Sequence, residues 1–300
     1  VRNAFGNEPE RGLDNDTRIT IVLIKLPSSS TLAGYFYSVD LYPRDPKNTS
    51  YRISNERKIF YIKYGMADTT TFGTLAHEFQ HMINYYQKNK TLNYNASMIK
   101  EDTWINESLS KYSEEVCGYS ILQGDQNTAS LMSKSMQNNK SLSLTEWNEP
   151  TINCYGQVYM FMHFFAHPGR YNSISNEITR ALVTGGGNTY TGVKNVESVS
   201  NEPFKETMAK WALSLFLNNY SSESPTAYGL HGINLTGKYN GIKLPGYTIE
   251  NVDSPISLSD MPYENSIRFF RKASTGSGDT TITVTTGARP VTLWLFDERE

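Results

Sequence analysis

Two histidines and a glutamate within five consecutive positions, His77, Glu78 and His81, have the clearest potential for chemistry in this sequence. Histidines at positions i and i+4 of an α-helix project to one face, at a separation that lets both imidazoles reach one metal ion. A glutamate beside them can act as general base on a water molecule held by that metal. The spacing therefore predicts a zinc site, with Glu78 as the catalytic base.

The surrounding residues predict the helix that this spacing requires. Apolar side chains recur with helical period at Phe72, Leu75, Ala76, Phe79, Met82, Ile83 and Tyr86. On a helical wheel of about 100° per residue, His77 and His81 lie almost opposite this apolar stripe, and Glu78 borders them. We expect the stripe to pack on the core and the imidazoles to face a cleft. A chance occurrence of the short pattern is the alternative.

Glu107 is the candidate for the third protein ligand that a catalytic zinc ion needs besides water. It lies in a second amphipathic helix, predicted over residues 102–118. The apolar side of that helix consists of Ile105, Leu109, Tyr112, Val116 and Tyr119. Glu107 lies on the opposite side, where it faces either a cleft or solvent. Lys111, Glu114 and Glu115 share or flank that side, and Glu114 could either support a ligand or be a charge on the rim.

The remaining pattern predicts an α+β fold. Residues 1–65 are sheet-rich, with β-branched and aromatic runs at residues 17–26, 32–39 and 57–64. Helical patterns follow, and beyond the two described above they cover residues 157–166, 175–183 and 203–217. Three short β-like runs end the sequence, at residues 267–271, 280–285 and 290–296.

These patterns suggest how the chain is divided. We expect a catalytic domain over residues 1–219, with a sheet-rich part at 1–65 and a mainly helical part at 66–219. An irregular connection rich in Gly, Pro, Asn and Ser follows at residues 220–265. Residues 266–300 are interpreted as the start of a C-terminal β module that is truncated here.

Composition excludes several classes of protein. Hydrophobic residues make up 38% and aromatic residues 12% of the 300 residues, which is enough for a packed core. The formal net charge of −2 provides no basic field for nucleic acid or an anionic membrane. No apolar run approaches the roughly 18 residues of a membrane span. The sequence begins with Val1 instead of methionine, so we read it as either a processed or a trimmed chain.

The two motifs together resemble those of a known group of enzymes. A His-Glu-x-x-His helix followed by Trp-x-Asn-Glu-Ser-Leu-Ser, with 25 residues between His81 and Glu107, resembles the gluzincin zinc peptidases. The flanking segments at 34–36, 54–56 and 74–83, with Asp40, are similar to the hyicolysin family of secreted bacterial metallopeptidases. The resemblance covers roughly residues 10–220. It implies a secreted or cell-surface protein that acts on proteins or peptides.

The resemblance also implies roles for individual residues. His77, His81 and Glu107 would be the Zn²⁺ ligands, and Glu78 the catalytic base. Gluzincins add a Tyr or His that stabilises the oxyanion, and the candidates here are Tyr155, Tyr159, His163 and His167. Tyr155 is favoured, because gluzincin aminopeptidases carry their catalytic tyrosine just before a comparable glycine and helix.

Two further expectations depend on the resemblance. In gluzincins, a strand in the place of residues 57–64 forms the edge of the cleft and pairs with extended substrate. We also hypothesise that Cys117 and Cys154, the two cysteines of the chain, form a disulfide between the ligand helix and the oxyanion segment, as a secreted protein permits; two free thiols are the alternative.

The sequence therefore predicts a zinc-dependent endopeptidase, with three alternatives left open. An aminopeptidase would share the metal chemistry. Gluzincin aminopeptidases hold the substrate's free amine with a Gly-x-Met-Glu-Asn sequence, which is missing here. Glu56 could still bind an amine. An adhesin on a protease-like fold would not need the base. A structural zinc site would need four protein ligands, and the sequence suggests three.

Overall fold

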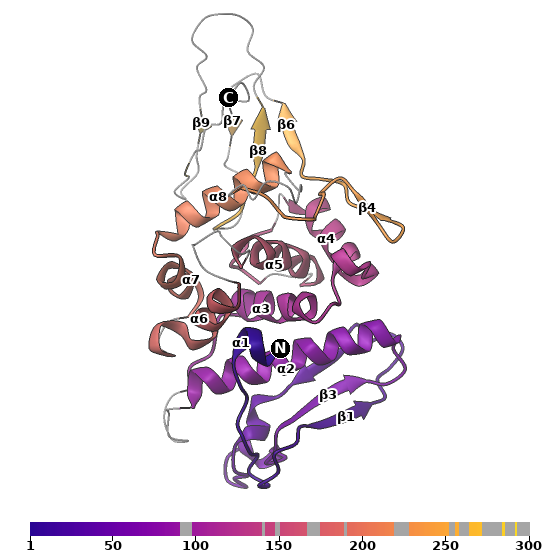
Figure 1. The fold of residues 1–300 in the computed structure, drawn as a ribbon, viewed down its shortest axis with the longest axis vertical. Coiled ribbons are helices and arrows are strands. Elements are labelled where there is room, and N and C mark those ends of the chain that lie inside the picture. Colours follow the sequence, from indigo (N-terminus) through magenta and orange to yellow (C-terminus); the bar gives the residue numbers. More distant parts are fainter. Residues whose placement is uncertain are drawn as a thin grey trace, which may run out of the picture.

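The computed structural model describes residues 1–90, 98–139, 142–147, 151–166, 175–188, 191–218, 228–251, 256–257, 264–271, 284–285 and 292. The fold is mixed α+β, as predicted, with small sheets and a largely helical middle. Figure 1 shows a layered arrangement, in which the N-terminal sheet is followed by the helices α2 (Asp68–Asn89), α3 (Thr103–Val116) and α5 (Ile152–Phe165). The strands between residues 249 and 285 lie beyond α8 (Phe204–Leu217). Within the described residues, no helix is long and apolar enough to cross a bilayer.

The N-terminal sheet has three strands, β1 (Thr20–Ile24), β2 (Gly34–Phe36) and β3 (Ile59–Lys63). Their order is β1-β3-β2, with β1 parallel and β2 antiparallel to β3. The expectation that residues 57–64 form an edge strand is therefore wrong, because β3 is hydrogen-bonded on both sides. The edge strand next to the helix that carries His77 and His81 is β2.

Strand β2 lies unusually close to helix α2 (Asp68–Asn89). A Cβ atom built on Gly34 would come within 2.8 Å of both the Thr74 side chain and the Tyr61 carbonyl oxygen. Only glycine permits this approach, which brings the edge strand against the helix that carries the histidines.

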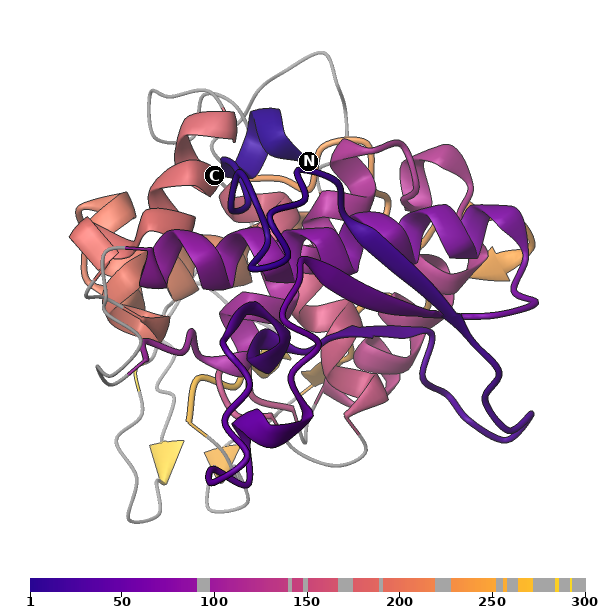
Figure 2. The same cartoon turned by 90° about the horizontal axis from the view of Figure 1, so that it is seen from below.

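Helix α2 is covered on two sides. Phe60, Ile62 and Met82 form a small core between the sheet and the helix. Helix α2 also packs against α3 (Thr103–Val116), as Figure 1 shows, and Figure 2 views the molecule with the N-terminal sheet in front of α2. His77 is only 9% exposed, whereas the apolar Phe72 is 48% exposed. The apolar stripe therefore packs on the core only in part, because Phe72 is exposed. The two histidines lie between α2 and α3, where they line a hollow, as expected.

The central core surrounds α3, α4 (Gln126–Gln137) and α5 (Ile152–Phe165). Trp104, Phe161 and Trp211 are fully buried and pack edge-on in this core. Helix α5 begins five residues earlier than predicted, so Tyr155 lies inside the helix instead of opening it. Gly156 allows α5 to approach α4, because a Cβ atom there would lie 2.3 Å from the Leu131 carbonyl oxygen.

Other helices complete the described fold. The α-helices are α1 (Arg2–Phe5), α6 (Ser175–Asn188), α7 (Gly192–Ser200) and α8 (Phe204–Leu217), and the short 3-10 helices are Ser38–Leu41, Tyr51–Ile53 and Ile121–Gln123. Helices α4 and α7 were not predicted, because their Ser, Thr, Asn and Gln content resembles a loop. Helix α4 instead gains a side-chain cap, since the Asp125 carboxylate accepts from the Thr128 amide.

The C-terminal region contains short paired strands. They are β4 (Lys238–Tyr239), β5 (Ile242–Lys243), β6 (Ile249–Asn251), β7 (Ile256–Ser257), β8 (Phe269–Arg271) and β9 (Val284–Thr285). Strands β8 and β9 fall within two of the three predicted β runs, and β6 pairs in parallel with β8. The run predicted at 290–296 lies, except for Thr292, outside the described residues. Leu230, Ile233 and Leu244 join the helical core, and the proposed domain boundaries stay predictions.

Candidate active site

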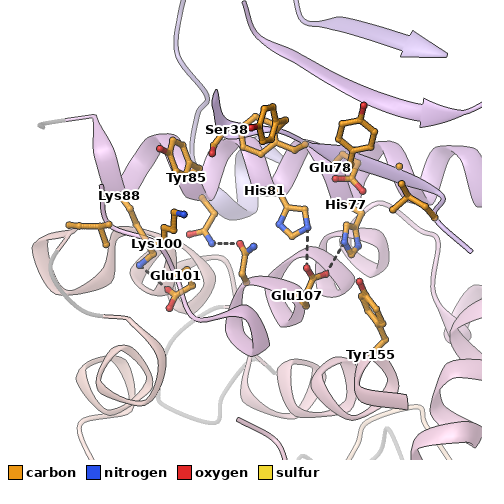
Figure 3. A pocket seen from close by; sticks show the side chains of 18 residues that line it. Ser38, His77, Glu78, His81, Tyr85, Lys88, Lys100, Glu101, Glu107 and Tyr155 are labelled. Atoms are coloured by element: carbon orange, nitrogen blue, oxygen red, sulfur yellow. Dashed lines mark hydrogen bonds and ion pairs between the residues drawn. The ribbon is translucent and has the colours of Figure 1, made fainter. Parts of the chain in front are cut away.

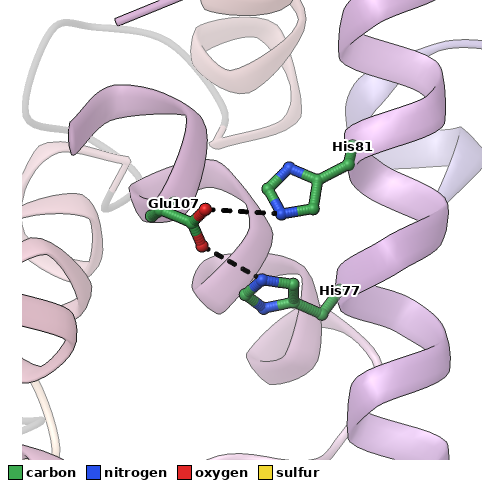
Figure 4. Close-up of side chains that lie close together, drawn as sticks. All are labelled: His77, His81 and Glu107. Carbon is green, nitrogen blue, oxygen red and sulfur yellow. Dashed lines mark hydrogen bonds and ion pairs between the residues drawn. The ribbon is translucent and has the colours of Figure 1, made fainter. Parts of the chain in front are cut away.

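Helices α2 and α3 bring three side chains from the two sequence motifs together. His77 Nε2 lies 3.2 Å from Glu107 Oε2, and His81 Nε2 lies 3.7 Å from Glu107 Oε1. Candidate ligand atoms of the three residues all lie within 4.8 Å of one another. Figure 4 shows both imidazoles projecting from α2 toward the Glu107 carboxylate on α3. The two separate motifs therefore form one cluster.

This cluster fits a zinc ion by its dimensions and donor types. Ligand atoms about 2.0–2.2 Å from a tetrahedral zinc ion lie roughly 3.3–3.6 Å from one another, close to the two distances given above. Two imidazole nitrogens and one carboxylate oxygen are the three protein ligands of a common type of catalytic site. Among the described residues, no fourth His, Cys, Asp or Glu joins the group.

The outer nitrogen of each imidazole has its own hydrogen-bond partner. His77 Nδ1 lies 2.8 Å from Glu114 Oε1, and Glu114 Oε2 accepts from Lys111 Nζ at 2.6 Å. His81 Nδ1 lies 3.0 Å from Ser110 Oγ, which itself donates to Gln80 Oε1. Both Nδ1 atoms are thus best placed to donate, which leaves each Nε2 directed at Glu107 and available to a metal.

Glu114 and Ser110 extend the candidate site beyond the first three residues. Glu114 was recognised in the sequence as a possible supporting group, and the structure places it on His77. Ser110 was missed, although it follows Glu107 by three positions and so shares its helix face. That spacing was the signal that could have found it.

The charges of the cluster are arranged around His77. Burial opposes protonation of this imidazole, but hydrogen bonds to Glu107 and Glu114 outweigh it and raise its pKa to about 10. Burial lowers the pKa of His81 to about 4. Burial also works against ionised Glu107, but the nearby histidines hold the pKa of its carboxyl below the usual range. Without metal, His77 therefore carries the proton that a metal ion must displace.

Glu78 lies beside the cluster, with its carboxylate directed at the same space (Figure 3). It is 5% exposed, and burial raises the pKa of its carboxyl to about 7. The backbone N–H of Phe36, on the edge strand β2, donates to this carboxylate. A buried carboxylate with a pKa near neutrality is suited to exchange protons with water and with a leaving group.

Tyr155 is the oxyanion candidate that reaches this site. Its ring lies 6.4 Å from the His77 ring and packs edge-on against Trp147 at 5.1 Å. Burial and the nearby Glu107 carboxylate raise the pKa of the phenol far above its usual value. Tyr155 thus remains protonated and can donate a hydrogen bond.

The other oxyanion candidates lie elsewhere. Tyr159 donates to Glu115 Oε2 at 2.6 Å, and His163 Nδ1 lies 2.9 Å from the same oxygen. Neither residue lines the cavity beside His77, His81 and Glu107. These two residues tie α5 to α3, and His163 Nε2 also donates to the His231 carbonyl oxygen. His167 lies outside the described residues.

A hollow of about 400 Å³ begins at this cluster and extends along α2. His77, Glu78, Glu107 and Tyr155 lie at one end, and Lys88, Lys100 and Glu101 lie at the other (Figure 3). The segment from Leu32 to Ser38, which includes β2, forms one wall. The hollow is therefore long enough to accept more than the reacting atoms of a ligand.

The hypothesised disulfide is not formed. No bond joins Cys117 and Cys154. Cys117 Sγ instead lies 3.8 Å from the α-amino group of Val1, and the Cys154 side chain is buried at the start of α5. The two helices are held together by packing and by the Glu115 hydrogen bonds.

The Glu114 contact leads to a first prediction. Glu114→Gln should weaken zinc binding by about 10- to 100-fold, because the amide loses the charge that holds His77 Nδ1–H and turns an N–H₂ group toward Lys111 Nζ. Titration against a chelator of known affinity measures this loss. The exposed Glu206→Gln, on α8, is the matched control. Unchanged zinc affinity in Glu114→Gln would contradict a supporting role.

Comparison with known proteins agrees with metal-dependent chemistry. No protein-family model matches the chain. Over 261 aligned residues, the chain is 24% identical to the neutral metalloprotease ShpI of Staphylococcus hyicus. The alignment covers 81% of this chain but 54% of that protein, so the chain spans about half the length of this relative. Most of this chain is therefore similar to part of a metalloprotease.

Proposed function

We propose that this chain is the catalytic part of a zinc-dependent endopeptidase of the gluzincin type, close to the hyicolysin family. The observation that supports this proposal most strongly is the convergence of His77, His81 and Glu107 beside the buried carboxylate of Glu78. In this proposal the first three residues hold Zn²⁺, which lowers the pKa of water and polarises a carbonyl when bound. The similarity to a metalloprotease supports the same chemistry.

The chain's own residues supply the remaining steps. Glu78 accepts the proton of the attacking water and delivers it to the leaving amine. Tyr155 donates a hydrogen bond to the carbonyl oxygen as negative charge develops on it. Glu114, with Ser110, holds the two imidazoles so that both Nε2 atoms face Glu107.

Strand β2 takes the substrate-binding role that the sequence suggested for β3. It is an edge strand, and residues from Leu32 to Ser38 line the hollow. Its outer N–H and C=O groups can pair with an extended peptide. Such backbone pairing holds a substrate at several residues and suits cleavage within a chain.

The placement of Glu56 favours an endopeptidase over an aminopeptidase. Glu56 accepts from the backbone N–H of Arg44 at 2.9 Å and does not line the hollow. The group that could have held a free substrate amine is therefore outside the hollow. Comparing cleavage of free and N-blocked peptides distinguishes the two activities.

The alternatives from the sequence are also less well supported. A structural zinc site would need a fourth protein ligand, which the described residues do not add to the cluster. An adhesin would gain nothing from a buried carboxylate such as Glu78 beside the metal ligands. A secreted or cell-surface location remains part of this proposal.

Metal removal tests the proposal directly. The purified protein should contain about one zinc ion per chain and hydrolyse casein. Treatment with a chelator should abolish the hydrolysis, and added zinc should restore it, because the three protein ligands contribute no hydrolytic group of their own. Metal analysis and release of acid-soluble peptides are the measurements. Hydrolysis that persists in metal-free protein would refute the proposal.

A further inference from the structure

The end of the hollow away from His77, His81 and Glu107 has a charge pattern that peptide hydrolysis at these residues does not require. Lys88, Lys100 and Glu101 line this end. Lys88 and Glu101 form an ion pair at 2.9 Å, with side chains only 1% and 3% exposed. This pair is buried in the wall of the hollow and its two charges cancel, so it presents little net charge to a ligand.

The Glu101 carboxylate has no capacity left for a further cation. Its Oε1 atom accepts from the Gly192 and Asp102 amides at 2.6 and 2.9 Å. Its Oε2 atom accepts from Lys88 Nζ and Asn195 Nδ2, both at 2.9 Å. A lysine or arginine side chain of a substrate would therefore find no open carboxylate here.

Lys100 is different from its neighbours. It is exposed, it lines the hollow, and it forms no ion pair with any residue that the structure describes. Figure 3 shows its side chain among those that line the hollow, on the far side of His81 from Glu78. With the other two charges paired, the ammonium group of Lys100 leaves this end of the hollow with one net positive charge.

The backbone on both sides of Lys100 is anchored. The Ile99 amide donates to Asn89 Oδ1, and Asn89 Nδ2 donates to the Ile99 carbonyl oxygen, both at 2.8 Å. Glu101 is held by the contacts described above. Lys100 is thus a single residue between two fixed points, and this restricts the region that its ammonium group can reach.

The direction of the substrate follows from the role of Glu78. Glu78 delivers the proton to the leaving amine, so the amine half of the substrate lies at the Glu78 end. The acyl half then extends past His81, along α2, toward Lys100. We infer that Lys100 selects substrates with an aspartate or glutamate side chain on the acyl side of the cleaved bond. This inference rests on the proposed peptidase function.

End-capped peptides test the selection. Each peptide carries Glu, Gln or Lys at one of the three residues before the cleaved bond. At low salt, kcat/KM for the best Glu peptide should exceed that for its Gln counterpart by about five- to tenfold, as one partly solvated ion pair allows. The preference should shrink at 1 M salt, because the Debye length falls to about 3 Å.

Charge reversal identifies the residue responsible. Lys100→Glu should abolish the Glu preference and favour the Lys peptide over the Gln peptide, and Lys100→Gln should remove charge selection. Lys134→Glu, an equal charge change on the exposed side of α4, should keep the wild-type order. Equal cleavage of the three peptides by the wild-type protein, or a Glu preference that survives in Lys100→Glu, would overturn the inference.

A binding measurement separates this inference from the proposed function. Zinc-loaded Glu78→Gln should bind the Glu peptide more tightly than the Gln peptide, by a similar factor, and adding Lys100→Glu should reverse this order. If that result is obtained while the wild-type protein cleaves no peptide, the selection stands and the peptidase proposal fails. Equal Kd values for the two peptides would overturn the selection even if hydrolysis is observed.

Discussion

Glu78→Gln should reduce peptide hydrolysis by about 10³- to 10⁴-fold while zinc remains bound. The reduction is large because one carboxylate both accepts the proton of the attacking water and supplies the proton of the leaving amine. Glutamine has nearly the same shape, and its Oε1 atom can still accept from the Phe36 amide, so the fold should be retained. Turnover of a fluorogenic peptide and zinc content per chain are the two measurements.

The pH dependence of hydrolysis by the wild-type protein provides a second readout of the same residue. Glu78 must be ionised to act as a base, and burial raises the pKa of its carboxyl to about 7 in the metal-free pocket. Activity should therefore fall as the pH drops through this pKa, which a bound cation shifts to lower pH. Glu206→Gln should leave both the rate and the pH profile unchanged. Full activity in Glu78→Gln would show that another group is the base.

Glu107→Gln should lower zinc affinity by about 10²- to 10³-fold. Structural zinc sites gain about 10–16 kcal/mol from four ligands, so one ligand accounts for roughly a quarter of that amount. The Glu107 carboxylate is the group that faces both Nε2 atoms, at 3.2 and 3.7 Å, and a neutral amide is a poorer ligand than an anion. Competition with a zinc chelator measures the affinity, and circular dichroism checks that α2 and α3 stay folded.

The ranking of variants makes this second prediction specific. Glu107→Gln should lose more zinc affinity than Glu114→Gln, because in our proposal Glu107 binds the ion directly, whereas Glu114 acts through His77. It should also lose hydrolytic activity at limiting zinc and recover part of it at high zinc. Zinc affinity equal to that of the wild-type protein would mean that the third ligand lies elsewhere.

Several features of the fold were readable from local sequence. Period and composition identified the α+β class, the helices around residues 77 and 107, and the three N-terminal strands, with errors of a few residues at their ends. Helices α4 and α7 were missed, because their polar residues resemble loops until a partner such as α5 buries one face. The edge role expected for residues 57–64 was also wrong, since an apolar strand looks the same at the centre and at an edge of a sheet.

The sequence by itself determined which chemistry is available, because helical period places His77 and His81 on one face and a second motif supplies Glu107. Tertiary structure decided that these groups meet, that Ser110 and Glu114 orient the imidazoles, and that β2 forms the wall of the hollow. It also placed Lys100 at the far end of that hollow. Backbone periodicity is a property of neighbouring residues, whereas contacts between α2, α3 and β2 depend on how the whole core packs.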